Sequence, residues 1–571
     1  MSGTVVPLHP VDVDFLARID ALRSPEVTAT HSGPPRLPSR KAISEHFTRI
    51  VAEWEPHPFT PQERETVRLD GLRYLVIVRR IEQVQRDIYP RPLPEEVQAQ
   101  LSFARQSYML RCFRLFRIND LPTEIISNIL RFMIWDSMRT PVRARLHITW
   151  TCRRWREIAL ADSTLWNAIW FRGNSMERAW AWFERARATP LDIRIDCDSS
   201  GDDSDPDESE DSTVLGISTE PSTKAVEMRQ MLLRLFTKLA TIRMLIVVVQ
   251  KCHWKKALGM LELLSTFAPS TGVPMLKRVE FHRGGLENED RSFLSWPKVI
   301  FRPFLGGAVA PCLEYLSLNG VSIDWSTSTL ANLTTLDIRR FPQSHFLDAA
   351  RFREVLMNCP RLHKLCLDGA GPKFEEQGSK PVELPHLRVL VVADLSRRDT
   401  IFLFSQISAP SVNSLTLMNL YGDDYLPIFL KITSAFPKVR LLTTYSVQFD
   451  SSPVGIESMR RWLDSMPLLA YLRVANVVNH FFEVFSRPDG PETPVAPHLK
   501  FADFQSVDPG LIVQWVKDRA RHRTPLEKIY FSEELGGRLD DTQIRTLMGL
   551  SCKLAKLPRG ATAPEEAALS L

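Results

Sequence analysis

The sequence is poor in glycine, and its cysteines form no closely spaced pairs of the zinc-ribbon kind. Only 24 of the 571 residues are glycine, whereas 40 are proline. This balance favours chain reversals begun by proline over glycine-rich catalytic loops. The eight cysteines are scattered along the chain without a Cys-x-x-Cys pair. We therefore expect reduced thiols in an intracellular compartment and no disulfide framework.

The sequence also lacks a long apolar run and a strong charge of one sign. The longest apolar run, Met244–Val249, is long enough only for a strand, since a membrane-spanning helix needs roughly 18 residues. The N-terminal residues contain acids and lack the basic-then-apolar pattern of a secretion signal. The net charge of +5 is too small over this length to indicate nucleic acid or a membrane. We expect a soluble protein of the cytoplasm, the nucleus or both, with no nucleic-acid or membrane partner.

Residues 1–59 are rich in proline, and we expect a mostly disordered lead-in. Only the short apolar stretch near Phe15–Leu22 can pack against other elements. Thr60, Pro61 and Glu63 then have the types and the spacing of a capping box with proline in the first turn. This combination predicts that a helix begins here.

An apolar seam follows at alternating spacings of three and four residues, formed by Tyr74, Ile77, Ile81, Val84 and Ile88. This spacing indicates one buried helix face. Three prolines end the helix, and a second helix is expected to run to about residue 114. We therefore predict a helical hairpin over residues 60–116. A partner-binding coiled coil is the alternative, which is disfavoured because the seam spans only about two heptads.

The next segment is dense in tryptophan, and five of the 13 tryptophans are Trp135, Trp150, Trp155, Trp166 and Trp170. One helix is predicted to bury Ile125, Ile126, Ile129, Leu130 and Met133. A second helix is predicted to carry a single stripe of Ile148, Cys152, Trp155 and Ala159. The basic cluster Arg153, Arg154 and Arg156 leaves RNA binding as an option, but a solvated rim is the preferred interpretation.

An acidic segment, residues 198–212, holds eight acidic residues and almost nothing apolar. Such a segment cannot bury enough surface to offset the entropy lost on ordering, so a solvated loop is expected. Its serines are candidate phosphorylation sites, a question that the sequence leaves open.

A repeated phrase fills the C-terminal two thirds: proline, any residue, an apolar residue, two residues, and two apolar residues one apart. Copies begin at Pro274, Pro311, Pro360, Pro385, Pro410, Pro437, Pro467, Pro497 and Pro525; residues 330–338 lack the proline, and 190–195 and 242–248 are degenerate. From Pro360 onward the copies are 25–30 residues apart, and with L-x-x-L-x-L this indicates leucine-rich repeats. Each repeat contributes a short strand whose inward leucines only stacked neighbours can cover. We predict an irregular solenoid over 173–550 and a disordered tail at 551–571.

The period of two along each strand predicts which side chains line the open, concave face of the sheet. Charged, aromatic and aliphatic residues mix there, which suits a protein or peptide ligand better than a phosphate backbone. The residues expected to bind a protein substrate are Tyr315, Lys364, Tyr471, Arg473, Phe501, Lys528 and Tyr530.

Motifs of catalysis and metal binding are missing from the sequence. It contains no G-x-x-x-x-G-K-[ST], H-E-x-x-H or G-x-S-x-G. Residues 368–373 come nearest to a glycine-rich loop and are interpreted as an ordinary repeat loop. Cys359, His363 and Cys366 are close in sequence, but the repeat frame points their side chains in different directions. We predict no catalytic residues, no metal and no cofactor.

Residues 117–172 resemble an F-box. The resemblance rests on Leu121-Pro122-x-Glu124-Ile125, Ile129-Leu130, Leu146, Cys152-Arg153-Arg154-Trp155-Arg156 and Leu165-Trp166. With the helices before it and the repeats after it, nearly all of residues 60–550 looks like a fungal-type F-box protein with C-terminal leucine-rich repeats. Its fold class would be α/β: an N-terminal helical region with a three-helix F-box module, then the solenoid. Thr151 departs from the family, which usually has valine there, and Trp150 has no evident counterpart.

The resemblance implies a substrate receptor that has no catalytic activity of its own. In this family the F-box docks on a Skp-type adaptor, which a cullin scaffold holds together with a RING protein and a ubiquitin-conjugating enzyme. The positions carried over as F-box core and adaptor surface are Leu121, Pro122, Ile125, Ile129, Leu130, Leu146, Cys152, Trp155 and Trp166. The alternative is a leucine-rich-repeat scaffold or peptide-binding protein without a ligase role, in which the F-box caps the solenoid.

Overall fold

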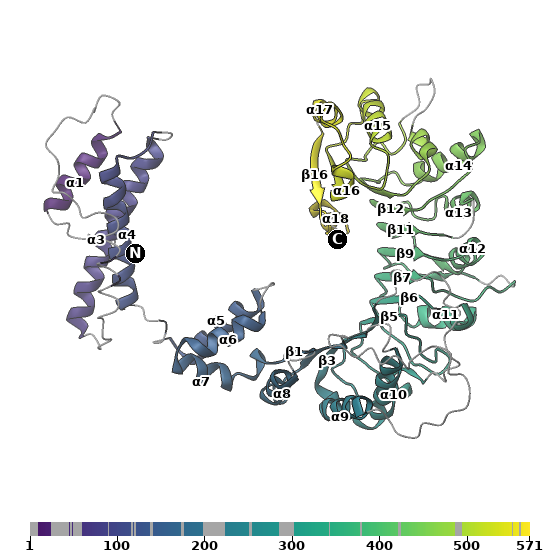
Figure 1. Ribbon diagram of the computed structural model, residues 1–571, viewed down its shortest axis with the longest axis horizontal. Helices are drawn as coiled ribbons and strands as arrows, with labels where there is room; N and C mark the ends of the chain where they lie inside the picture. The colour runs from purple at the N-terminus through teal and green to yellow at the C-terminus, as the bar shows by residue number, and fades with distance from the viewer. Residues whose placement is uncertain are drawn as a thin grey trace. The chain divides into compact units, whose positions relative to one another are not determined.

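The computed structural model describes most of the chain as two compact units, Met1–Asp162 and Ser163–Leu571 (Figure 1). The described residues are 10–23, 45, 48, 60–88, 91–115, 118, 121–136, 141–172, 176–197, 223–249, 254–284, 302–341, 343–376, 380–420, 424–485, 494–550, 552–558 and 561–570. No helix within these ranges is both long enough and apolar enough to cross a bilayer. The acidic segment 198–212 lies outside them.

Among the described residues, the first unit opens with the helices α1 (Pro10–Ala21), α3 (Pro61–Asp87) and α4 (Glu95–Leu115). The capping box predicted at the start of α3 is confirmed. The backbone N–H of Thr60 donates to the Glu63 carboxylate at 2.9 Å, and the backbone N–H of Glu63 donates to the Thr60 hydroxyl at 3.3 Å. Two backbone donors at the helix start are thereby satisfied, which fixes where α3 begins.

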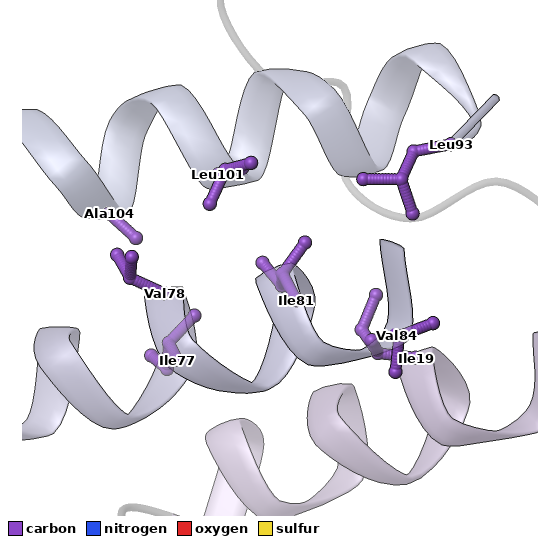
Figure 2. Packing of buried hydrophobic residues seen from close by; sticks show 8 residues of the cluster. All are labelled: Ile19, Ile77, Val78, Ile81, Val84, Leu93, Leu101 and Ala104. Carbon is purple, nitrogen blue, oxygen red and sulfur yellow. The ribbon is translucent and has the colours of Figure 1, made fainter. Parts of the chain in front are cut away.

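Helices α3 and α4 run antiparallel, as their ion pairs show: a residue late in α3 pairs with one early in α4, and a residue early in α3 pairs with one late in α4. Arg105 pairs with Glu82 at 2.6 Å, and Arg111 pairs with Asp70. The core that these helices form with α1 consists of Ile19, Ile77, Val78, Ile81, Val84, Leu93, Leu101 and Ala104 (Figure 2). The predicted seam lies here: three of its five residues are in this core, and the other two, Tyr74 and Ile88, pack against it.

Helix α1 shows that part of the 1–59 lead-in is ordered. It contains most of the apolar stretch near Phe15–Leu22, and its Ile19 is buried against α3. Arg80 of α3 pairs with Asp20 at 2.5 Å, so polar contacts accompany the apolar ones. The rest of the lead-in, apart from residues 22, 23, 45 and 48, lies outside the described residues.

Three further helices follow in the first unit: α5 (Thr123–Asp136), α6 (Pro141–Thr151) and α7 (Arg153–Ala161). The prediction of one uninterrupted stripe through Cys152 is wrong at that residue. Cys152 has extended backbone angles (φ −158°, ψ 168°), and its Sγ accepts a hydrogen bond from the backbone N–H of Trp155 at 3.4 Å. Because the Cys152 side chain caps the following turn, α7 begins as a separate helix.

The second unit is a solenoid built on one parallel sheet of 14 strands, which neighbour one another in chain order. The strands are β1 (Ala168–Arg172), β2 (Leu191–Cys197), β3 (Ile242–Val249), β4 (Arg278–Arg283), β5 (Tyr315–Asn319), β6 (Thr335–Arg339), β7 (Lys364–Asp368), β9 (Val389–Ala393), β11 (Ser414–Met418), β12 (Leu441–Tyr445), β13 (Tyr471–Ala475), β14 (Phe501–Gln505), β15 (Lys528–Ser532) and β16 (Lys553–Leu557). A separate pair consists of β8 (Val382–Glu383) and β10 (Ile407–Ser408). Every predicted repeat phrase contributes a strand to the long sheet.

The helices of this unit connect the strands, except for α18, which follows the last strand. They are α8 (Met176–Arg185), α9 (Thr223–Phe236), α10 (Trp254–Thr271), α11 (Ala349–Met357), α12 (Arg397–Gln406), α13 (Leu426–Ile432), α14 (Pro453–Asp464), α15 (Pro509–Arg521), α16 (Glu533–Gly536), α17 (Asp541–Gly549) and α18 (Pro564–Ser570). Helices α11 to α14 lie on the outer, convex side of the sheet, and the strands line the inner side (Figure 1). This arrangement is consistent with the predicted leucine-rich-repeat solenoid.

Strand register stacks equivalent residues of successive repeats. Leu316 of β5 pairs with Leu336 of β6, which pairs with Leu365 of β7 and then Leu390 of β9, and all four are buried. A single repeat could not cover such a leucine, so the core exists only because the repeats stack. The side chains one position earlier and one position later in each strand form the two rows of the concave face.

The solenoid continues beyond its predicted end at residue 550. Strand β16 pairs with β15, aligning Lys553 with Lys528, and α18 follows it. The prediction of a disordered tail at 551–571 is therefore wrong for residues 552–558 and 561–570. β16 lacks the proline-led phrase, but it covers the edge that β15 would otherwise leave unpaired.

Candidate functional site

Helix α5 is apolar on two sides, and only one of them is buried. Its inner face consists of Ile126, Leu130 and Ile134, each at most 1% exposed. Its outer face consists of Ile125, Ile129, Phe132 and Met133, of which Phe132 is 76% exposed and Ile125 and Met133 are 45% exposed each. The outer residues are spaced four, three and one apart, so they share one side of the helix. A soluble helix with a second, uncovered apolar side is suited to binding another protein.

Polar contacts fix which side of α5 faces inward. Asp162, at the end of α7, accepts hydrogen bonds from the Ser127 hydroxyl and from the Arg131 guanidinium at 2.9 and 3.1 Å. The Asp162 side chain is only 10% exposed. Because a charge-assisted hydrogen bond at a shielded carboxylate is strong, this contact holds α5 against α7 with its outer face turned away.

The basic cluster considered for RNA is engaged within the three-helix segment. Arg154 donates to the backbone carbonyl of Leu121 at 3.0 Å, and Arg156 donates to the backbone carbonyl of Thr149 at 2.8 Å. Arg153 pairs with Glu157 at 2.9 Å. These contacts favour the interpretation as a rim that ties the segment together.

The predicted adaptor-surface residues fall into three groups by exposure. Leu130 and Trp166 are buried; Leu121, Ile129, Leu146, Cys152 and Trp155 are half-buried; Pro122 and Ile125 are exposed. Leu130 and Trp166 therefore serve the core and contact the protein's own chain. Trp166, for example, packs its ring 5.8 Å from the ring of Trp182.

Several exposed apolar residues were missed or misplaced by the sequence pattern. Phe132 was not singled out, and Ile125 and Met133 were expected in the buried face of their helix. Trp150, which had no evident counterpart in the family, is 65% exposed. The pattern could not separate the two faces of α5, because both are apolar and adjoin around the helix.

The second candidate surface is the concave face of the sheet. Strand register places Tyr315 and Lys364 in one row, together with Tyr471, Phe501 and Lys528. Tyr315, Lys364, Phe501 and Lys528 are half-buried, whereas Tyr471 is fully buried. Arg473 and Tyr530 belong to the neighbouring row, and Tyr530 is 2% exposed. The expectation that Tyr471 and Tyr530 are exposed is wrong, because the C-terminal helix covers them.

Acidic side chains at β4 and β6 of the concave face are paired with bases on their own strands. Glu280 accepts hydrogen bonds from Arg278 and, at 2.6 Å, from His282. Burial alone would raise the pKa of Glu280, but these two partners outweigh it and hold that pKa below its ordinary value. Asp337 likewise pairs with Arg339 at 2.7 Å. This part of the face therefore carries little unbalanced charge.

Asp368, at the end of β7, is half-buried and lies close to a second carboxyl group. Burial, together with a hydrogen bond and the charge of Asp394, raises the pKa of Asp368 to about 7. Asp394 follows β9 in left-handed backbone conformation (φ 53°), which brings it beside the end of β7. A carboxyl group that is protonated near neutral pH makes the stability of this turn depend on pH.

The residues considered for metal or phosphate binding take up structural places. Cys359 and Cys366 are buried, and burial raises the pKa of both thiols. Lys373, at the end of the glycine-containing loop, pairs with Asp348 at 3.0 Å. Within the ranges that the structure describes, no three His, Cys, Asp or Glu side chains gather as metal ligands would.

A pocket of about 310 Å³ lies among the loops that follow β5, β6 and β7. Its arginine, Arg351, donates to the backbone carbonyl of Trp325 at 2.8 Å, and its lysine is held by the ion pair with Asp348. The basic groups of this pocket are thus engaged in holding the loops together.

Comparisons with known proteins identify the three-helix segment. The F-box-like family model matches residues 118–172. Among solved structures, the chain is similar to the leucine-rich repeat-containing protein LegL7 from Legionella pneumophila, at 12% sequence identity and a TM-score of 0.30. That similarity covers 53% of this chain and 92% of the LegL7 chain. No curated protein matches the chain.

Proposed function

We propose that this protein is the substrate-recognition subunit of a ubiquitin ligase of the Skp–cullin–F-box type. Its F-box-like domain docks on a Skp-type adaptor, and through the adaptor on a cullin–RING ligase. The solenoid binds a protein substrate. The subunit itself makes and breaks no covalent bond, and it acts in the cytoplasm, the nucleus or both.

The outer face of α5 is the observation that carries this proposal. It lies within the residues that match the F-box-like family, and it exposes Phe132, Met133 and Ile125 together. Burying an apolar side chain of this size contributes about 1.5–3 kcal/mol to association. A few such residues account for most of the binding free energy of a typical interface, so this face offers anchor residues for an adaptor contact.

The mechanism that follows is tethering. A substrate held on the solenoid encounters the ubiquitin-loaded enzyme as part of one assembly, and short connections give effective concentrations of about 1 mM. The continuous parallel sheet suits this role, because a rigid connection loses less of that gain than a flexible one.

Direct binding to a purified Skp-type adaptor tests the proposal. We expect the full-length chain to bind the adaptor in isothermal titration calorimetry. Phe132→Ala should weaken that binding at least tenfold, about 1.4 kcal/mol, because it removes the most exposed apolar side chain of the outer face.

The matched control is Met357→Ala, which removes an apolar side chain that is 57% exposed at the end of α11 in the solenoid. We expect it to leave the adaptor affinity unchanged. If both variants weaken binding equally, the outer face of α5 is not the docking surface. If the folded wild-type chain binds no adaptor, the adaptor-docking role itself is contradicted. The alternative of a leucine-rich-repeat scaffold or peptide-binding protein without a ligase role would then stand.

A further inference from the structure

The C-terminal helix of the chain lies against the concave face of its own solenoid (Figure 1). α18 follows β16 in the chain and carries the adjacent acids Glu565 and Glu566 in its first turn. We call the residues beneath it the tail site: Leu441, Tyr471, Arg473, Phe501, Lys528 and Tyr530. Five of these six were predicted from the sequence to bind a protein substrate.

Each glutamate of α18 has its own basic partner in the tail site. Arg473 donates from both terminal nitrogens to Glu566, at 2.6 and 3.2 Å. Lys528 donates to Glu565 at 3.1 Å, and the Tyr530 hydroxyl donates to the same carboxylate. Burial alone would raise the pKa of Glu565, but the bonds from Tyr530 and Lys528 outweigh it and hold that pKa below its ordinary value. The site therefore pairs each of two adjacent glutamate side chains with a basic side chain of the solenoid.

Arg473 is held ready for its carboxylate. Its Nε donates to Asp503 at 2.6 Å, and the Asp503 side chain is only 1% exposed. This buried contact fixes the plane of the guanidinium, so that the two terminal nitrogens point together at Glu566. Fixing an arginine fork in advance lowers the entropy lost when it binds a carboxylate at two points.

Apolar contacts flank the acidic pair on both sides. Ala563, just before α18, is fully buried in a cluster with Leu441, Tyr471 and Tyr530. Leu569, three residues after the second glutamate, packs against the same cluster. The tail site thus accommodates a small residue, two adjacent glutamates that follow it two and three positions later, and a leucine three residues after the second glutamate.

The helix is also attached in a way that allows it to leave. It is not a strand of the 14-stranded sheet, so its departure breaks no strand pairing. It has only seven residues, and helices shorter than about 12 residues are marginal on their own in water. Its polar contacts with the tail site are made between side chains. Each such contact contributes less to stability than the burial of a core side chain does.

We propose that the tail site is a binding site for acidic helical segments of other proteins, which displace α18 from it. α18 is the occupant in cis and shows the chemistry that the site accepts. As a statement about ligase substrates this rests on the proposed function, whereas peptide binding itself requires no adaptor. Because α18 is tethered, it competes for the site at an effective concentration of about 1 mM. A ligand that binds too weakly to outcompete it does not occupy the site.

The experiment uses a fluorescein-labelled synthetic peptide of residues 561–571 and measures its binding by fluorescence anisotropy. The protein is the full chain carrying Glu565→Lys and Glu566→Lys, which repel its own α18 from Arg473 and Lys528. We expect the labelled peptide to bind this variant at least tenfold more tightly than it binds the wild-type chain. A peptide in which both glutamates are replaced by lysine should bind neither protein.

The matched control is Glu533→Lys with Glu534→Lys, an adjacent and exposed pair on α16 that undergoes the same change of charge. It should bind the labelled peptide as weakly as the wild type does. If the first variant loses its cooperative thermal transition, the milder Glu566→Gln takes its place, with an expected gain of at least threefold. Equal affinity for all proteins, or binding of the lysine peptide, would overturn the inference. Because no adaptor is present, failure here is distinct from failure of adaptor docking.

Discussion

In the first unit, α5 leaves the Phe132 side chain largely exposed, whereas in the second unit Tyr471 and Tyr530 are buried beneath the chain's own C-terminal helix. From the sequence alone, both regions were expected to contact another protein. One is apolar, and the other combines basic and aromatic side chains. In this respect the two expected binding regions of one chain are opposites.

The difference follows from what each surface needs. Exposing an apolar face to water costs free energy roughly in proportion to the exposed area. Contact with another apolar surface removes that cost. A basic face can be satisfied by a few acidic side chains, and the C-terminal segment supplies two of them, Glu565 and Glu566. We infer that only another protein can cover the outer face of α5. The tail site is already covered by α18, which another acidic segment can replace.

The largest effect is expected inside α5, where two apolar residues two positions apart differ in burial. Leu130→Ala should lower the free energy of unfolding by about 3 kcal/mol, because it leaves a cavity at a fully buried position. Phe132→Ala should change it by less than about 0.5 kcal/mol, because its side chain is mostly exposed. Urea unfolding of both variants checks this contrast, and similar losses for both would show that the outer face is packed on the protein itself.

An intermediate effect is expected at Asp368, near the part of the concave face that α18 does not cover. Its folded pKa of about 7 lies above the ordinary value of 3.8, so the folded chain binds more protons than the unfolded chain between about pH 4 and pH 7. The free energy of unfolding therefore falls as the pH rises through this window. Asp368→Asn should remove that dependence, with little effect at pH 4. At pH 8 it should stabilise the protein by about 2 kcal/mol, roughly half of what the full pKa shift implies, because solvent screens the half-buried carboxyl group.

Thermal unfolding of the wild type and of Asp368→Asn at both pH values measures this change. A variant that is as unstable as the wild type at pH 8 would show that the carboxyl group is ionised without cost, in contact with Arg339 and Arg340. Those two arginines are the groups whose charge opposes the upward shift of the Asp368 pKa.

The smallest effect is expected from Glu566→Gln, which removes one charge from the helix over the tail site. We expect it to change the free energy of global unfolding by less than about 1 kcal/mol, because a partly exposed ion pair contributes little. Hydrogen exchange at residues 561–570 should nevertheless become faster, since those residues open locally. A loss of several kcal/mol would instead show that α18 is an integral part of the solenoid, and the contrast with α5 would disappear.

The sequence predicted the repeats well because their signal is strong and local. Leucines such as Leu365 and Leu390 recur in a strand period within a longer period of 25–30 residues, and stacking them is the only way to bury them. The capping box at Thr60 was readable for the same reason, since it depends on neighbours in the chain.

The sequence could not show which side of α5 is covered, nor that the tail folds back. Both sides of that helix are apolar, so the choice between them depends on Asp162, which is distant in sequence from Ser127 and Arg131. The tail segment, with two acids among alanines, looks solvated by composition. Its contacts with Arg473 and Lys528 are made across 93 and 37 residues of chain, and no local pattern encodes them.

Hydrogen–deuterium exchange of the full-length chain, with and without a purified Skp-type adaptor, tests the central claim most directly. The proposed docking predicts that the adaptor slows exchange in α5, Thr123–Asp136, and leaves exchange in α18, Pro564–Ser570, unchanged. Slower exchange confined to the solenoid, or no change anywhere at saturating adaptor, would contradict the assignment of the outer face of α5 as the docking surface.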